Sequence, residues 1–319
     1  MANYRDIHGF QIEVRSDNPS NPVNGQVWYN TTDSKLKGAA ISSTGAWATG
    51  GNMGTARENG MAAGTQTAGL AFGGSPNTAN CEKYDGTSWT EVANLNSARS
   101  QGGGSGTQTS ALAYAGETPN NTRDLTESWN NTAWTELADL NTGRHLATGC
   151  AGASNTSALG FGGGASPSGY CEQWDGTCWT EVADLNSARY NIAGSGTATA
   201  CLAYGGAAPF VALTESWNNT CWSEVADLNT ARATLGGAGT TNTNALAFGG
   251  EVDPAPATAA TEKYNGTCWS EVADLNQTAT GNKGAGITTA ALSFGGGIDP
   301  DGTEEWSEPF ISIREFTVS

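Results

Sequence analysis

The chain has 319 residues, of which 14 are basic and 31 are acidic, so that its formal net charge is −17. This balance disfavours nucleic acid and anionic membrane surfaces as partners, because both are bound through clusters of Lys and Arg and no such cluster occurs. Membrane insertion is not expected, because no apolar run reaches the ~18 residues of a spanning segment.

The first 45 residues differ from the rest of the chain. Residues 1–24 are polar and irregular, without the basic and apolar regions of a secretory signal. Residues 25–38, GQVWYNTTDSKLKG, predict two short strands around a Thr-Thr-Asp-Ser turn. We therefore predict an N-terminal attachment segment over residues 1–45 that contains a short β-hairpin.

From residue 46 onward one motif recurs, and its clearest copy is TESWNNTCWSEVADLNTAR, which begins at Thr214. Successive copies are spaced by 43 to 47 residues. A period in this range is typical of repeat architectures, which form one continuous body. The second aromatic residue of the motif falls at Trp89, Trp134, Trp179, Trp222 and Trp269.

Each unit predicts four strands. A segment led by Arg precedes a Gly- and Thr-rich turn and a short apolar run such as ALAF, which is too brief for a helix. The recurring motif adds two strands around an Asp-Gly or Asn-Gly pair, which favours a two-residue hairpin turn. Such a turn at Asp175 and Gly176 would place Glu172 opposite Trp179, with Trp174 and Trp179 on one face. Four strands in each unit of about 45 residues indicate an all-β fold, the β-propeller.

The apolar runs predict six four-stranded blades over residues 46–319. After the last run only one half-motif follows, Thr303–Trp306, and the segment around Trp47 can supply its missing partner. We therefore expect a ring closed by strands from both termini, which also covers free sheet edges. If residues 25–38 form a further partial blade, the count becomes seven. The six runs end at Gly74, Gly116, Gly163, Gly206, Gly250 and Gly296.

The order of Arg, glycine, an apolar run ending in Gly-Gly, and two spaced aromatic residues resembles the kelch repeat. The pair Gly73-Gly74 with Tyr84 and Trp89 carries this likeness in the first unit, and it extends from about Trp47 to Trp306. The units are shorter than kelch repeats, and the TEVADLN segment is not general among them. The resemblance implies a kelch-like β-propeller.

The N-terminal text MANYRDIHG, followed by NPVNGQVWYNTTDSKLKG and Gly/Thr-rich units, is similar to virion structural and tail-fibre-like proteins of tailed bacteriophages, particularly marine ones. This resemblance implies a protein made in the host cytoplasm and located in the tail or fibre region of the virion. Its partners would be other virion proteins, bound through the N-terminal segment, and a host-surface glycan or protein. The resemblance is also compatible with assembly of the chain into a homo-oligomer.

A recurrent Arg opens each unit except the sixth, where Gln277, Thr278 and Ala279 stand instead. These guanidinium groups would either form an anion-binding ring or pair with carboxylates that tie one blade to the next. The second interpretation is favoured, because acids such as Glu224 and Asp227 repeat in step with the Arg. The absence in the sixth unit suggests a locally different closure. The five residues are Arg57, Arg99, Arg144, Arg189 and Arg232.

The seven cysteines do not predict a disulfide framework. Cys178, Cys221 and Cys268 hold one repeat position, where Ser88 and Ala133 stand in other units. That position accepts small side chains, and the same position in different repeat units lies too far apart for bonding.

Catalytic and metal-binding signals are weak. Only His8 and His145 occur, and neither a zinc motif nor a helix-opening glycine loop is present. His145 has one nearby nucleophile, Cys150, and a core role is favoured for it. Residues 298–302 have the acid spacing of a calcium loop but too few oxygen ligands. We expect no cofactor and no enzyme activity.

The units differ most in the link that follows each glycine pair, whereas their other segments are nearly identical. Such loops tolerate change, and a rigid scaffold often uses them for binding. They should emerge on the same side as the crossovers between blades. We therefore expect host-surface recognition there, with a structural adaptor or decoration protein as the alternative and a glycan-degrading enzyme as the third. The candidate binding residues are Glu117, Tyr170, Phe210, Glu251 and Asp253.

Overall fold

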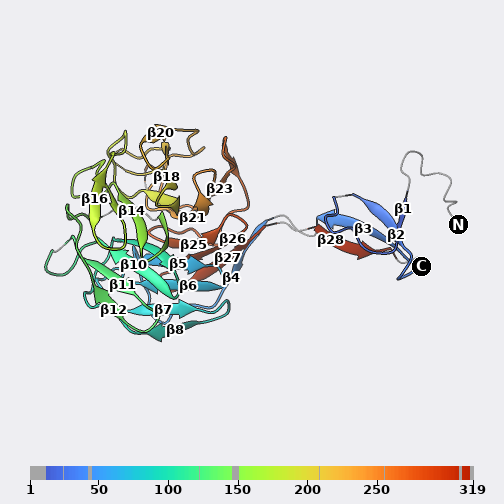
Figure 1. Ribbon diagram of the computed structural model, residues 1–319, viewed down its shortest axis with the longest axis horizontal. Coiled ribbons are helices and arrows are strands. Elements are labelled where there is room, and N and C mark those ends of the chain that lie inside the picture. The colour runs from blue at the N-terminus through green and yellow to red at the C-terminus, as the bar shows by residue number, and fades with distance from the viewer. Residues whose placement is uncertain are drawn as a thin grey trace. The chain divides into compact units, whose positions relative to one another are not determined.

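The computed structural model describes residues 12–23, 25–41, 45–121, 123–145, 151–207, 209–254, 256–308 and 311–316. These residues form strands arranged in seven four-stranded sheets (Figure 1). The all-β class is confirmed, and the fold is β-propeller-like. The expected count of six blades is wrong, and the alternative of seven, with residues 25–38 in the additional sheet, agrees with the seven sheets. No helix within the described ranges could cross a membrane.

The chain divides into two compact units. Residues Ala46–Ser307 form one unit, which holds six of the sheets. Residues Met1–Gly45 and Glu308–Ser319 form the other, which we call the terminal unit. The larger unit begins at residue 46, where the propeller was expected to begin, and residues 308–319, which were expected to belong to the propeller, are part of the terminal unit.

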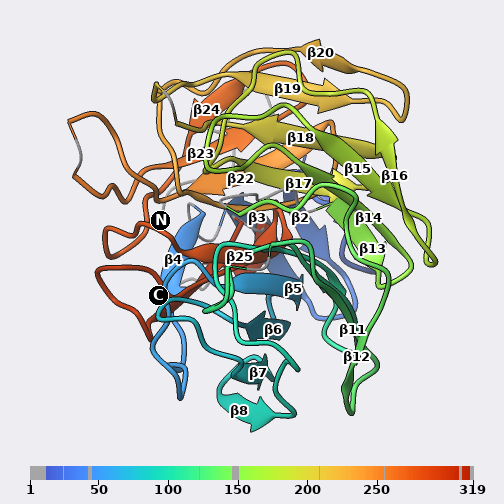
Figure 2. The same cartoon turned by 90° about the vertical axis from the view of Figure 1, so that its left-hand side faces the viewer.

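The first sheet of the larger unit shows how each repeat folds. It contains β5 (Met61–Thr65), β6 (Ala68–Phe72), β7 (Cys81–Tyr84) and β8 (Trp89–Val92), paired antiparallel in this order. The second strand is the most buried, since all of its residues except the first are inaccessible. Figure 2 shows the fourth strands, such as β8 and β20, on the outside of the unit. The short apolar runs of the sequence are thus the buried strands that their length predicts.

Four further sheets repeat this arrangement. Their strands are β9 (Gly103–Thr107), β10 (Ser110–Tyr114), β11 (Thr126–Trp129) and β12 (Trp134–Glu136); β13 (Ala151–Ser154), β14 (Ser157–Phe161), β15 (Cys171–Trp174) and β16 (Trp179–Val182); β17 (Ala193–Thr197), β18 (Ala200–Tyr204), β19 (Thr214–Trp217) and β20 (Trp222–Glu224); and β21 (Gly236–Thr241), β22 (Asn244–Phe248), β23 (Thr261–Tyr264) and β24 (Trp269–Glu271).

The remaining sheet of this unit combines strands from both ends of the sequence. It contains β25 (Lys283–Ile287), β26 (Ala290–Phe294), β27 (Thr303–Ser307) and β4 (Ala46–Thr49). The predicted pairing is present, with Trp306 opposite Trp47 in an antiparallel ladder. The outer strand that the C-terminal repeat lacks is therefore supplied by the segment before the first repeat.

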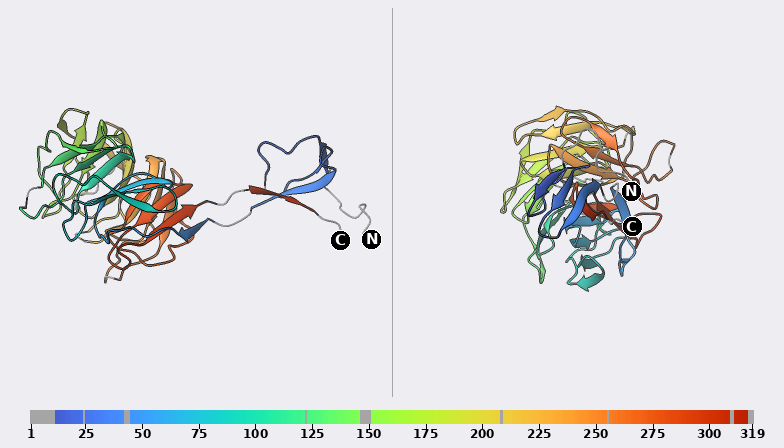
Figure 3. Two further views of the ribbon diagram at one scale, coloured as in Figure 1. Left: turned by 90° about the horizontal axis from the view of Figure 1, so that it is seen from below. Right: turned by 90° about the vertical axis from the view of Figure 1, so that its right-hand side faces the viewer.

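The terminal unit contains the seventh sheet, in the order β1 (Glu13–Arg15), β2 (Val27–Asn30), β3 (Lys35–Ile41) and β28 (Ile311–Glu315). The expected hairpin of residues 25–38 is β2 and β3. Figure 3 shows the red strand β28 beside the blue strand β3, with which it pairs antiparallel. Lys35 and Glu315 form an ion pair at 2.6 Å across this ladder. The C-terminal strand belongs here because it completes the sheet beyond β3, whose edge would otherwise be unpaired.

The outer hairpins have longer turns than expected. Trp174 lies directly opposite Trp179, and Glu172 lies opposite Glu181, so that residues 175–178 form a four-residue connection. The predicted two-residue turn is wrong. The Asp175 carboxylate accepts hydrogen bonds from the backbone N–H groups of Thr177 and Cys178, at 2.8 and 3.0 Å, and stabilises the longer turn. Both tryptophans still share one face.

Neighbouring sheets pack closely because their first strands are rich in glycine. A Cβ atom on Gly104 would lie 2.5 Å from the Ala62 carbonyl oxygen, and one on Gly284 would lie 2.3 Å from that of Gly237. Neither distance is compatible with a side chain. The glycines of the first strands therefore allow direct backbone contact between sheets.

The second aromatic residue of each motif connects one sheet to the sheet before it. Its indole N–H donates to the Thr that opens the third strand of the preceding sheet, for example from Trp179 to Thr126 Oγ1 at 2.9 Å. In two sheets that Thr is replaced by Cys81 or Cys171, and the indole N–H groups of Trp134 and Trp222 find no standard acceptor. The other three donors are Trp47, Trp89 and Trp269.

Candidate functional site: the loop face

The links between the second and third strands lie beside the crossovers that join successive sheets. We call this surface the loop face. Isolated β-bridges connect links and crossovers, as in the pairs Glu58 with Ser75 and Thr78 with Arg99. One link thus contacts the crossover before its sheet and the crossover after it. The links are residues 75–80, 117–125, 164–170, 207–213, 251–260 and 297–302.

The recurrent Arg fixes each crossover to the sheet that follows it. Arg232 donates from Nη2 to Glu262 Oε1 at 3.0 Å and from Nη1 to the carbonyl oxygens of Gly249 and Ala260. Glu262 also accepts the backbone N–H of Asn229, at 2.7 Å. We call this set of contacts the Arg–Glu clamp. It recurs as the ion pairs of Arg57 with Glu82, Arg99 with Glu127, Arg144 with Glu172, and Arg189 with Glu215.

The clamp decides between the two interpretations of the Arg series. The guanidinium groups are buried and paired with carboxylates, so they do not form an accessible anion-binding ring. The partner differs from the expected one. It is a Glu in the third strand of the following sheet, whereas Glu224 and Asp227 belong to the preceding segment. Each pair therefore joins a crossover to its own sheet instead of joining two sheets.

The five predicted binding residues lie in four different links. Tyr170 is 53% exposed and Asp253 is also exposed, so both can meet a partner. Glu117 pairs with Arg123 at 3.1 Å, and Glu251 accepts a hydrogen bond from the Thr280 hydroxyl at 2.7 Å. Phe210 is partly buried. The structure therefore places all five on the loop face but does not gather them into one pocket.

A groove of about 320 Å³ lies beside Tyr170. It combines the Tyr170 ring with the carboxylates of Glu181 and Asp184 from the acidic segment of the same repeat. The acidic segment repeats in every unit, so the predicted binding residues do not include Glu181 or Asp184. One feature of the sequence could have indicated the groove, because only the third unit places a Tyr directly before its third strand. The remaining lining residues are Thr142, Cys171, Glu172 and Val182.

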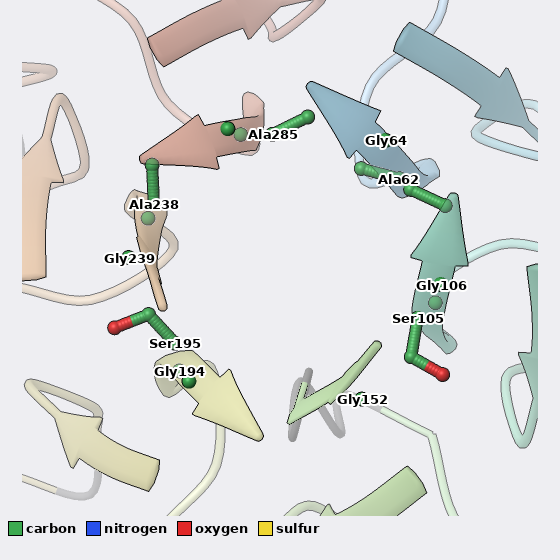
Figure 4. A pocket seen from close by; sticks show the side chains of 16 residues that line it. Ala62, Gly64, Ser105, Gly106, Gly152, Gly194, Ser195, Ala238, Gly239 and Ala285 are labelled. Carbon is green, nitrogen blue, oxygen red and sulfur yellow. The ribbon is translucent and has the colours of Figure 1, made fainter. Parts of the chain in front are cut away.

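A second pocket lies between the first strands of the six sheets (Figure 4). It has a volume of about 80 Å³, and its lining consists of Gly, Ala and Ser. The hydroxyl groups of Ser105 and Ser195 are turned toward neighbouring strands, where a Cβ on Gly152 or Gly239 would lie 3.1 or 3.0 Å from them. The small side chains thus reflect close packing of the strands.

Titratable groups of the described chain do not assemble into a metal site, since no three His, Cys, Asp or Glu residues are suitably grouped there. His145 is buried, and burial holds the pKa of its imidazole below the ordinary value, as does the nearby charge of Arg123. Cys150, the nucleophile expected near it, lies outside the described residues, as does His8. The candidate calcium loop brings Asp299 against Gly302.

The cysteines divide into two groups. Cys178, Cys221 and Cys268 are exposed in the outer turns, at the position that accepts Ser or Ala. Cys81 and Cys171 are buried, and burial raises the pKa of each thiol to about 12. Cys201 is also buried, and none of these six forms a disulfide.

Comparison with known proteins supports the fold alone. No protein-family model matches the chain, and no curated protein matches it. Among solved structures, one described as the structure of YjhT superposes with a TM-score of 0.65 at 12% sequence identity. The match covers 82% of this chain and 99% of that one.

Proposed function

We propose that the chain is a non-enzymatic structural protein of a tailed-bacteriophage virion, associated with the tail or fibres, whose loop face recognises the host surface. One observation carries this proposal. The links differ in length and sequence while the crossovers and strands that hold them repeat, and β-bridges fix five of the six links to that frame within the described residues. A rigid scaffold with variable loops on one side is a common basis for recognition. The likeness of the N-terminal text to phage virion proteins supports the location.

We further propose that Ala46–Ser307 is a kelch-like ring closed by β4. Two contacts between the first and last sheets support closure. The backbone N–H of Asn59 donates to the Gly281 carbonyl oxygen at 2.8 Å, and Trp89 donates to Thr303 Oγ1 at 2.9 Å.

Replacing a link tests the recognition proposal. Residues 251–260 are exchanged for the shorter link SPNTAN of residues 75–80, and the labelled full chain is assayed on a panel of cultured marine bacteria. We expect the exchange to abolish cell binding with little change in Tm. The matched control changes Asn265 to Asp in an outer turn, on the opposite side of the sheet, and should bind normally. Unchanged binding after each of the other five links is exchanged in turn would refute recognition by this face.

An adaptor role is the second candidate, and the terminal unit favours it. Val14, Tyr29 and Phe316 are exposed apolar side chains on one small sheet. Such a cluster suits a contact with another virion protein or with a second copy of the chain. Deleting residues 1–24 separates the candidates. Loss of particle incorporation would favour docking by this unit, whereas normal incorporation with lost adsorption would favour recognition.

A further inference from the structure

The sixth sheet of the larger unit keeps the frame of the Arg–Glu clamp but lacks its Arg. Glu304, at the position of Glu262, accepts the backbone N–H groups of Asn276 and Gln277 at 2.8 and 3.1 Å. The Gly302 carbonyl oxygen accepts the Gly295 N–H at 3.0 Å, just as Ala260 accepts that of Gly249. Ala279 stands where the other five units have Arg.

The Glu304 carboxylate has no cationic partner in the described chain. Its hydrogen bonds come only from Asn276 and Gln277 in that part of the structure. The five equivalent Glu residues are almost fully buried with their Arg, whereas Glu304 is partly exposed. Truncation of Arg to Ala therefore leaves a carboxylate that is held in place by backbone N–H groups and faces solvent.

A small cavity of about 20 Å³ lies beside Ala279, which holds the sequence position of the clamp Arg. Its lining includes Ala279, Gly295, Gly302 and Glu304, the counterparts of the clamp residues. Asp299 adds a second carboxylate, which lies against Gly302. Gln277 and Thr278 at the edge are exposed, so that the cavity can be reached from solvent. We call it the sixth-sheet socket.

We propose that the sixth-sheet socket binds a guanidinium group supplied by a ligand or a partner protein. The same arrangement, a carboxylate with two carbonyl oxygens, holds the guanidinium of Arg232 in the fifth sheet. A guanidinium fits because its planar set of N–H donors can reach several acceptors at once, whereas an ammonium is a compact point charge. The two carboxylates, Glu304 and Asp299, supply the charge that a cation requires. This inference does not depend on the proposed function.

Titration of the full chain with ethylguanidinium, a truncated Arg side chain, tests the proposal. The readout is the NMR signal of the Asn276 side-chain amide, which donates to Glu304 Oε2 at 2.7 Å. We expect a saturable shift with ethylguanidinium and a weaker response to ethylammonium at equal ionic strength. Ala279→Arg and Ala279→Met should each weaken binding at least tenfold (the second because it fills the cavity without charge).

Thermal unfolding gives a second measurement. Ala279→Arg should raise Tm by about 2–4 °C, as expected for a gain of roughly 1 kcal/mol in a unit of this size, whereas Ala279→Met should not. If either variant fails to fold, Glu304→Gln provides the test, since it should abolish the ethylguanidinium shift. An Asn276 signal that does not saturate in the unmodified chain, or a shift that persists in Glu304→Gln, would overturn the proposal.

A short peptide with one internal Arg distinguishes the two sources of the group. Tighter binding by the peptide than by ethylguanidinium indicates an Arg side chain of a protein partner. Equal or weaker binding indicates a small free ligand. Either outcome supports guanidinium binding by the socket. Failure of both the peptide and ethylguanidinium to bind refutes it.

Discussion

At the scale of single residues, the repeats act as controls for one another. The Trp–Thr contact occurs in four places, while Cys replaces Thr at residues 81 and 171. The indole N–H groups of Trp134 and Trp222 are buried there without a standard acceptor. A thiol sulfur accepts a hydrogen bond more weakly than a hydroxyl oxygen does, so these two sites are weaker than their four counterparts.

Restoring the hydroxyl should stabilise the protein. We expect Cys81→Thr and Cys171→Thr each to raise the free energy of unfolding by about 0.5–1.5 kcal/mol, the net value of one hydrogen bond. Urea denaturation followed by tryptophan fluorescence measures the change. The reverse substitution, Thr126→Cys, should lower the free energy of unfolding by a similar amount. If all three variants were as stable as the native sequence, the Trp–Thr hydrogen bond would not contribute to stability.

His145 should make stability depend on pH. Burial lowers its pKa in the folded state, so the imidazole stays neutral there while the unfolded chain still takes up a proton near the ordinary value of 6.5. Arg123 lowers the pKa further and Glu117 opposes this effect. Because the unfolded state binds more protons, stability is lost as the pH falls through about 6.5. Denaturation at pH 7.5 and 5.5 should show this loss in the native sequence and a smaller one in His145→Gln.

At the scale of the structural element, the Arg–Glu clamp joins a crossover, a glycine pair and a third strand. Its carboxylate accepts hydrogen bonds from both the guanidinium and the crossover backbone, so removing the charge leaves a buried Arg without its counterion. The sixth-sheet socket has the same frame without the Arg. Comparing the clamp with the socket therefore separates the contribution of the ion pair to stability from the contribution of the backbone hydrogen bonds.

A matched pair of substitutions measures the difference. Glu262→Gln should lower the free energy of unfolding by about 3–5 kcal/mol, because Arg232 is left buried and unpaired. Glu304→Gln should cost less than about 1 kcal/mol, as for an exposed charge. Thermal unfolding of both variants provides the comparison. Similar losses would show that the guanidinium does not determine the energy of the clamp.

At the scale of the whole molecule, strands from the two ends of the sequence meet twice. β27 pairs with β4 in the larger unit, and β28 pairs with β3 in the terminal unit. Each unit has its own set of internal contacts, and Trp28 is the one tryptophan of the terminal unit. The two units should therefore respond separately to truncation.

Deleting residues 308–319 tests this separation. The deletion removes β28 from the terminal sheet but leaves every strand of the larger unit intact. We expect hydrogen exchange to become faster over β2 and β3, while the strands of Ala46–Ser307 keep their protection and the unit keeps its Tm. Loss of protection throughout the chain would show that the two units unfold together.

The sequence by itself determined the repeat period, the strands of the repeat units and the pairing of the Trp47 segment with Thr303–Trp306, whereas β1 lies in a stretch that was expected to be irregular. These follow from local patterns, such as apolar runs between turn residues and a half-motif that needs a partner. The partner of each Arg, the four-residue outer turns and the place of β28 were decided by tertiary structure. The repeats contain several acids in step with Arg232, and only the fold brings Glu262 to it. The socket carboxylates Asp299 and Glu304 likewise follow Ala279 by 20 and 25 residues, too far for a local pattern, so their proximity was decided by the fold.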